Sequence, residues 1–502
     1  MKSITSRRHF LKSSATGGAV FALGDLSFLT RLPRLGAAES RLDPQIVRFN
    51  SDIEPLVRFL EDTPRERLLE EVAARIHRGL SYQHILAALF LAGVRNIQPK
   101  PVGFKFHSVL VVNSAHLASI SSPDSDRWLP IFWALDYFKS AQAEDVKQGD
   151  WTMSSAVEDR VPSPARSKQA FIEAMDHWDE QGADVAVTGL ARSSGAQELF
   201  ELFCRYGARD FREIGHKAIY VANAWRTLQA IGWQHAEPVL RSLAYGLLDR
   251  GGDDNPSTAD LEADRPWRRN QGLAKTIRSE WQAGQLSYEA TSEFLDTLRS
   301  GTADEAANKA VALLNRGIAP QSIWDGLFAG AGELLMRRPG LVSLHALTTT
   351  NAIHYAFQNS GSDETRRMMI LQNAAFLTLF RGNANKLKTV RIDQISQAPS
   401  DPPAVDAIFA EISRDRMTAA TQVLAYLKTN SEPDDFINSA RRLVFLKGTN
   451  SHDYKFSSAV LEDYQNISAR WRNQFLASSV FNLRGSGDKD NELVKRTRAA
   501  LA

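Results

Sequence analysis

Two copies of one polar pattern stand inside otherwise apolar segments of this chain. The pattern His-x5-Asn-x2-His occurs at 107–116 and returns at 345–354, so the residue numbers of the two copies differ by a constant offset of 238. Imidazole changes its charge near neutral pH and is the commonest metal-binding side chain, so this pattern indicates acid–base chemistry or metal ligation. Its members are His107, Asn113, His116, His345, Asn351 and His354.

Three further histidines stand in comparable contexts, and one pair of them suggests a second repeat. Gly215-His216 and Ser451-His452 are related by a similar offset of 236. We predict a functional cluster with seven catalytic candidates, which are His107, His116, His216, His235, His345, His354 and His452. The metal candidates are the four histidines of the duplicated pattern, His107, His116, His345 and His354, and imidazole suits iron, copper or another transition metal. The alternative is a structural hydrogen-bond network.

Polar residues beside these histidines are candidates for substrate binding. Asn113 and Asn351 precede a histidine by three residues, which puts both side chains on one helical face. They either contact a substrate or fix the tautomers of the rings. Thr349 either donates its hydroxyl to a substrate or bonds back to a helix carbonyl, and the second use is the commoner one.

The elements that must position these residues are predicted to be helices. Segments 66–77, 199–206 and 323–335 place apolar residues at helical spacing, and alternating patterns are scarce. We predict an all-α fold of tandem-duplicated helical units, packed as a repeat bundle or α/α array. Segment 107–120 reads as a buried helix, with a strand over 108–112 as the alternative. His116 follows His107 by nine residues, which is about 180° around an ideal helix, so the two side chains cannot share one face of a straight helix. Either the helix starts after His107, or a π-bulge intervenes, or a central helix presents its two imidazoles to opposite sides.

The chain is predicted to comprise an export signal and one domain. Residues 1–38 resemble a twin-arginine signal peptide, with Ser-Arg-Arg-His-Phe-Leu-Lys at 6–12, which predicts a periplasmic or extracytoplasmic location and passage through the twin-arginine translocase. Residues 39–502 form a single all-α domain of about four units, at 62–147, 168–250, 300–382 and 404–482. Polar, Pro- and Gly-containing loops separate these units.

Composition excludes several classes of function. The chain has 502 residues, a formal net charge of +2 and one cysteine, Cys204. We therefore expect no nucleic-acid partner and no internal disulfide. No later segment is apolar for long enough to give a stable membrane span. The remaining partner class is a small-molecule substrate.

Several of these histidine segments resemble the questin oxidase family. The resemblance rests on 344–354, on Gly215-His216-Lys217, on Trp233-Gln-His235 and on a His-x-x-Lys element at His452 and Lys455. It implies an oxygenase that opens anthraquinone-like rings in a Baeyer–Villiger-type step with NADPH. It also implies Lys455 as a substrate-binding candidate. An export signal departs from that pattern, because free NADPH is scarce outside the cytoplasm.

Two functional hypotheses follow from these observations. The first is an exported oxidoreductase that performs a monooxygenase-type oxidation of an aromatic or quinone-like small molecule at a cavity lined by histidines. The second is a non-catalytic periplasmic helical-repeat protein, a binding or scaffold protein whose histidines are structural. A cofactor-free hydrolase or isomerase would use the same residues.

Overall fold

The computed structural model describes residues 45–395, 402–430 and 433–502, and the predicted export segment lies outside them. The prediction of an all-α fold is confirmed. Within the described ranges, β-structure is limited to isolated bridges, Ile46 with Ser154 and Gln285 with Ile318. None of the described helices combines the length and the apolar character that crossing a bilayer would require.

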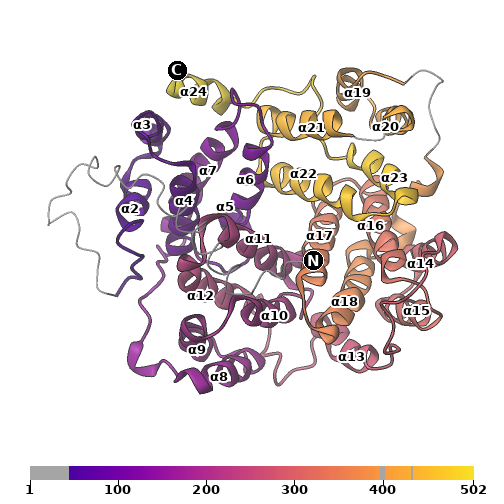
Figure 1. The fold of residues 1–502 in the computed structure, drawn as a ribbon, viewed down its shortest axis with the longest axis horizontal. Coiled ribbons are helices and arrows are strands. Elements are labelled where there is room, and N and C mark those ends of the chain that lie inside the picture. The colour runs from indigo at the N-terminus through magenta and orange to yellow at the C-terminus, as the bar shows by residue number, and fades with distance from the viewer. Residues whose placement is uncertain (1–44, 396–401, 431–432) are drawn as a thin grey trace, which may run out of the picture.

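The first half of the chain contributes the helices coloured indigo to magenta in Figure 1. They are α2 (Glu54–Asp62), α3 (Arg65–His77), α4 (Tyr82–Asn96), α5 (His107–Leu110), α6 (Val112–Ile120), α7 (Leu129–Lys147), α8 (Pro164–His177), α9 (Glu180–Ser193), α10 (Ala196–Gly207), α11 (His216–Ile231) and α12 (Ala236–Leu247).

The second half contributes the helices that follow in the same figure. They are α13 (Arg265–Ala274), α14 (Tyr288–Ser300), α15 (Ala303–Asn315), α16 (Pro320–Arg337), α17 (Leu341–Asn359), α18 (Asp363–Arg381), α19 (Val405–Ile412), α20 (Arg416–Thr429), α21 (Asp434–Lys447), α22 (Ser451–Asp463), α23 (Ala469–Ser479) and α24 (Glu492–Leu501). Short 3-10 turns are η2 (Phe104–Phe106), η3 (Glu158–Arg160), η4 (Arg212–Gly215), η5 (Trp233–His235), η6 (Glu262–Asp264), η7 (Ala384–Lys386), η8 (Ile392–Gln394) and η9 (Tyr464–Asn466).

Side-chain caps mark where several of these helices begin. Ser81 accepts a hydrogen bond from a backbone N–H of α4, and Thr302 forms a capping box with Glu305 at the start of α15. Asn450 caps α22 in the same reciprocal way with Asp453. Such caps satisfy backbone N–H groups that a helix leaves unpaired at its N-terminus. They explain why the helix starts are sharply defined by the local sequence.

The internal repeat is visible in the helix boundaries. Both ends of α15 follow those of α3 at the offset of 238, and the start of α16 follows that of α4 at the same offset. Both ends of α20 follow those of α9 at the offset of 236, and α22 begins within one position of that offset from α11. Each half of the chain therefore carries the same series of helices, and the weaker pairing at offset 236 belongs to the repeat.

Four helices, two from each half, form the centre of the molecule. Helix α11 packs against α6 and α17, and α22 packs against the same two helices, which closes a ring of four (Figure 1). The Nδ2 of Asn223 donates to the Leu110 carbonyl at 2.9 Å, and the Ser458 hydroxyl donates to that of Ser114 at 2.8 Å. Leu110 on α5 and Ser114 on α6 both follow His107 in the chain, Asn223 follows His216, and Ser458 follows His452. The α5–α6 segment, α11 and α22 therefore run in the same general direction, away from their histidines.

A second polar layer lies farther along the same helices. Arg226 on α11 donates to both carboxylate oxygens of Glu462 on α22, each at 2.9 Å, and to the Oδ1 of Asn351 on α17 at 3.1 Å. Asn351 in turn donates to Asp463 at 2.7 Å. Arg226 and Glu462 are 236 residues apart, so they are repeat equivalents that meet across the centre.

We expect Arg226→Met to destabilise the protein by about 2 kcal/mol or more, because it leaves the Glu462 carboxylate without its cation and the Asn351 Oδ1 without its donor. The matched control is Arg192→Met, which removes an exposed guanidinium that bridges Glu158 and Glu237. That change should cost about 1 kcal/mol or less, since exposed pairs contribute little. Urea unfolding of both variants measures the difference, and equal costs would contradict the central role of Arg226.

Candidate metal centre

Four histidines meet where the central helices begin. His107 and His216 are the first residues of α5 and α11, His452 is the second residue of α22, and His345 lies one turn into α17. The Nε2 of His216 lies 2.9 Å from the Nε2 of His107 and 2.8 Å from that of His345. The ligand atoms of His107, His345 and His452 lie within 4.8 Å of one another, and this group could hold a metal ion.

The opposite nitrogens of these rings are held by oxygen acceptors. The Nδ1–H of His107 donates to the Phe104 carbonyl at 2.9 Å, and that of His345 donates to the Leu341 carbonyl at 2.7 Å. The Nδ1 of His452 lies 3.2 Å from the Oδ1 of Asn450, an oxygen that also accepts from the His452 backbone N–H. A carbonyl oxygen can only accept, so Nδ1 carries the proton and Nε2 carries the lone pair. Metal-binding histidines show this arrangement as a rule.

A strained turn places the fourth ring. Glu213, Ile214 and Gly215 all have left-handed backbone conformations, with φ of 52°, 45° and 80°. Left-handed residues other than glycine cost of order 1 kcal/mol or more each and concentrate at functional sites. A Cβ on Gly215 would lie 2.0 Å from the Oγ1 of Thr349, so only glycine fits there. Although Glu213 and His216 have Glu-x-x-His spacing, this turn keeps them off a common helical face.

Proton counting shows why this arrangement favours a cation. The Nε2 atoms of His107 and His345 are fixed as acceptors, and both face the Nε2 of His216. That one nitrogen carries at most one proton, so it can donate only one hydrogen for the two contacts. The Nδ1 of His216 has no hydrogen-bond partner of good geometry, although the Glu213 backbone lies close enough to raise its pKa. One proton does not satisfy two converging lone pairs, whereas one ion does. Nitrogens bound at about 2.0–2.1 Å in a tetrahedron lie about 3.3 Å apart, which requires only a small separation of these rings.

Burial keeps the four imidazoles neutral. It lowers the pKa of His107, His216 and His345 well below the usual value, and the nearby Lys455 lowers each of them further. Burial, followed by Lys455, lowers the pKa of His452 to about 4. Neutral imidazole is the form that binds metals, so these rings are competent ligands at physiological pH.

Two buried polar groups beside the imidazoles have no hydrogen-bond partner. The Nζ of Lys455 and the Oγ1 of Thr349 are both fully enclosed and unpaired. Burial lowers the pKa of Lys455 well below that of an exposed lysine. Lys455 stands three residues after His452, on the same face of α22. Buried polar groups are normally paired, so each of these two groups requires an explanation.

The structure does not bring the second histidine of each duplicated pattern to this centre. His116 approaches the hydroxyl of Tyr82 at 3.0 Å, and His354 lies among the rings of Trp324, Phe328 and Phe357. The expectation that His116 and His354 join the metal set is therefore wrong. Helix α17 is continuous through its two histidines, and nine residues turn their side chains to opposite sides. In the first copy, α5 begins at His107 itself. The alternative in which the helix starts after His107, so that His107 and His116 could face the same site, therefore does not apply.

The other predicted residues occupy separate places. His235 is buried in η5, where Asp52 and His84 act on its pKa. Asn351 belongs to the second polar layer, and Asn113 is its buried first-copy counterpart on α6. Thr349 does not bond back to a carbonyl, unlike Thr348, whose hydroxyl lies 3.3 Å from the Leu344 carbonyl.

The metal candidates predicted from the duplicated pattern omitted His452, which belongs to the group that could hold a metal ion, and His216, whose Nε2 contacts two rings of that group. The shared offset of 236 between these two histidines was the available signal, because it makes them the repeat counterparts of each other, as His107 and His345 are at offset 238. Arg226 and Glu462 were missed altogether, although they carry the same offset. Repeat position relates the residues of these two pairs, but it does not by itself decide which counterparts meet, because His116 and His354 share the offset of 238 and lie apart.

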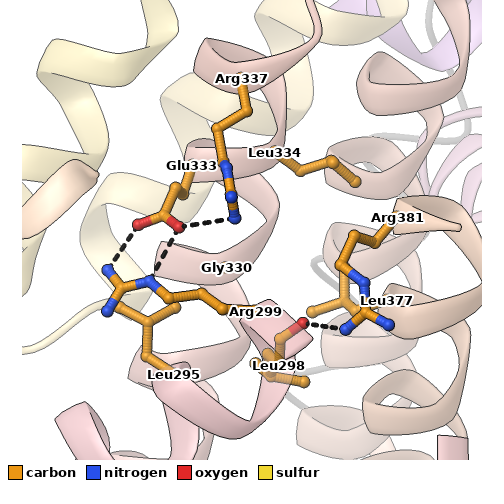
Figure 2. Close-up of a pocket in the computed structure, with 9 residues that line it drawn as sticks. All are labelled: Leu295, Leu298, Arg299, Gly330, Glu333, Leu334, Arg337, Leu377 and Arg381. Carbon is orange, nitrogen blue, oxygen red and sulfur yellow. Dashed lines mark hydrogen bonds and ion pairs between the residues drawn. The ribbon is translucent and has the colours of Figure 1, made fainter. Parts of the chain in front are cut away.

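Cavities elsewhere have different chemistry. The cavity in Figure 2 lies between α14, α16 and α18, and its guanidinium groups are already engaged. Arg299 and Arg337 contact Glu333, and Arg381 donates to the Leu298 carbonyl. This cavity is held by a satisfied ion-pair network and offers no free reactive group.

A surface groove borders the start of α22. It is lined by Trp133 and Tyr137 from α7 and by Asn450 and Ser451 at the start of α22. These last two residues directly precede His452, which is the only partly buried ring of the four. The groove therefore reaches the cap of the helix that carries a metal candidate.

Comparison of the chain with family models, with curated proteins and with solved structures gave no match. The resemblance to the questin oxidase family therefore stays a prediction from the histidine segments.

His354, the second histidine of the second pattern, makes a testable contribution to the pH dependence of the free energy of unfolding. Burial, with Arg226 as a smaller cause, lowers the pKa of His354 to about 3. The unfolded chain binds a proton near pH 6.5, so the folded state loses stability relative to it as the pH falls below that value. Between pH 7 and pH 5 this costs about 2 kcal/mol. The variant His354→Phe should lack that loss in denaturant titrations at both pH values, and parallel pH profiles would contradict a neutral buried ring.

Proposed function

We propose that this protein is an exported metal-dependent oxidoreductase that oxidises a small molecule at the four-histidine centre. The metal ion is held by the Nε2 atoms of His107, His216, His345 and His452. Dioxygen is the oxidant, with one oxygen atom inserted into the substrate and the other reduced to water by two electrons and two protons from an external donor. The proposed export rests on the twin-arginine motif at 6–12.

One observation carries the proposal. Three Nε2 atoms converge at 2.8 and 2.9 Å while two of their rings are fixed by carbonyls in the tautomer that leaves Nε2 unprotonated. Converging lone pairs are unfavourable without a shared cation. The His452 ring completes a set of four, and the hydrogen bonds at Nδ1 supply the outer-shell support that metal ligands need.

The ligand chemistry favours a redox-active transition metal. The set contains only imidazoles, which suit copper, iron, nickel and zinc, whereas magnesium and calcium prefer oxygen ligands. The proposed oxidation selects iron or copper from this group. The resemblance to the questin oxidase family supports an aromatic or quinone-like substrate. The family's NADPH is scarce outside the cytoplasm, so the exported protein takes its electrons from another donor.

The competing function is a periplasmic binding or scaffold protein with structural histidines. The duplicated helical array supports it, because such arrays commonly present binding surfaces. The two hypotheses differ in what the histidines do. In a scaffold their loss changes stability alone, and in the proposed enzyme it changes metal content and oxidation.

We expect the purified protein to bind about one equivalent of iron or copper, and His345→Gln to lower that affinity by more than about a hundred-fold. Loss of a residue that only hydrogen-bonds to a metal ligand typically lowers metal affinity ten- to hundred-fold, so loss of a ligand should lower it more. The matched control is His116→Gln, a histidine of the same duplicated pattern that lies outside the centre. Elemental analysis and chelator competition give the stoichiometry and the affinity.

Thermal unfolding provides a second measurement on the same samples. Metal should raise the unfolding midpoint of the wild type and of His116→Gln, because a ligand that binds only the folded state stabilises it. A wild type that stays metal-free and shows no spectral change with iron or copper would remove the proposal.

Oxidation is tested with the metal-loaded protein and an excess of a quinol such as 1,4-naphthohydroquinone, which serves as the substrate and also supplies the two electrons and two protons. We expect dioxygen uptake that is lost in His452→Gln and retained in His116→Gln, because only the former removes a ligand. An oxygen electrode records the rate, and liquid chromatography identifies oxygenated products. Metal binding without dioxygen uptake on any quinol would favour the scaffold hypothesis.

A further inference from the structure

We infer that the histidine centre binds its substrate as an oxyanion, and that Lys455 holds that oxyanion beside the metal. This inference rests on the proposed metal site and names the substrate class, which is a small molecule with a carboxylate, enolate or phenolate oxygen. Three separate observations lead to it.

The first is the unpaired amine. Lys455 is 2 % exposed, its Nζ is fully enclosed, and none of the described residues offers that nitrogen an acceptor. In either protonation state the nitrogen carries N–H groups, and a buried donor without an acceptor is costly. An oxyanion at the centre would supply the missing acceptor. The enclosed Thr349 hydroxyl, against Gly215 beside His216, offers a second donor.

The second is the charge of the site. Its four imidazoles are neutral ligands, so they do not reduce the charge of a bound metal ion. Within the described part of the chain, Asp453 is the carboxylate that acts on a ring of the cluster, and it is already paired with Arg484 at 2.7 Å. Isolated buried charges are strongly disfavoured. A divalent ion here therefore requires an anion that comes from outside the chain.

The third is the arrangement of the central helices. Helices α11 and α22, of 16 and 13 residues, begin at the cluster, whereas α17 begins one turn before His345. The N-terminal end of a helix carries about half a positive charge and stabilises anions. These two ends make the site electropositive before any metal is bound, and the enclosed amine of Lys455 adds N–H donors there.

Lys455 occurs in only one of the two repeat copies. Its counterpart on α11, three residues after His216, is the buried Ile219. The two halves thus place an isoleucine and a lysine at equivalent positions around one centre. An apolar residue fits the position, so the amine is not required to fill the space. This makes Ile219→Met a matched control for Lys455→Met.

The test measures oxyanion affinity and metal content in the same samples. Copper-loaded full-length protein is titrated with benzoate and with 4-nitrophenolate, and in parallel with their neutral analogues benzamide and nitrobenzene, by calorimetry and by copper absorption. We expect the oxyanions to bind and the neutral analogues not to bind. Lys455→Met should weaken oxyanion binding by about ten-fold to a hundred-fold, the range for a hydrogen bond to a charged group. Ile219→Met should leave it unchanged.

The two oxyanions distinguish carboxylate from phenolate substrates. Lys455→Met should also keep its copper content and raise the thermal unfolding midpoint, because it removes an unpaired buried donor. Equal affinity for charged and neutral analogues, or full oxyanion affinity in Lys455→Met, would overturn the inference while leaving the metal site intact. If the wild type binds no metal, the same titrations on the metal-free protein still decide it, and oxyanion binding that does not depend on Lys455 would overturn it.

Discussion

The structure depends on the convergence of imidazole lone pairs in the largely buried centre of the molecule. His107 and His345 each use one ring nitrogen to donate to a backbone carbonyl, and this fixes the other nitrogen as an acceptor. Both acceptors then face the Nε2 of His216, at 2.9 and 2.8 Å. A hydrogen-bond network would need more protons than these rings can supply. Packed helices from both halves hold the rings there, so the interior of the protein is organised around a group of imidazoles that could hold a metal ion.

The duplication explains how a single chain builds such a centre. Each half contributes two helices with a histidine near the N-terminal end, and the halves meet so that equivalent residues face one another. Arg226 and Glu462 illustrate the divergence of the two copies, because equivalent positions now carry opposite charges and pair across the middle. This ion pair and the Asn351–Asp463 contact lie beyond the histidines along the same helices. They fix the spacing of the helices and thereby the spacing of the rings.

The electrostatic character of the centre follows from what surrounds it. Burial keeps the imidazoles neutral, the helix ends are positive, and Asp453, the described acidic side chain that acts on a ring, is neutralised by Arg484. Lys455 adds a donor without an acceptor. The strained turn at Glu213 and Ile214 shows that the fold accepts a local cost to bring His216 into position. Such costs are retained where a precise geometry is needed.

Helical periodicity, caps and the internal repeat determined the all-α class and the correspondence between halves, because these depend on residues near one another in the chain. The repeat also singled out the histidines, and its offsets of 238 and 236 already related His107 to His345 and His216 to His452. Which rings meet was decided only by tertiary structure. His354 follows His345 by nine residues on one continuous helix, so its side chain lies on the opposite side of α17, against aromatic rings. The local sequence does not determine which side of α17 packs against the other three helices. The enclosure of Lys455 and Thr349 and the partners of Arg226 likewise depend on contacts between distant helices, which the packing of the whole chain sets.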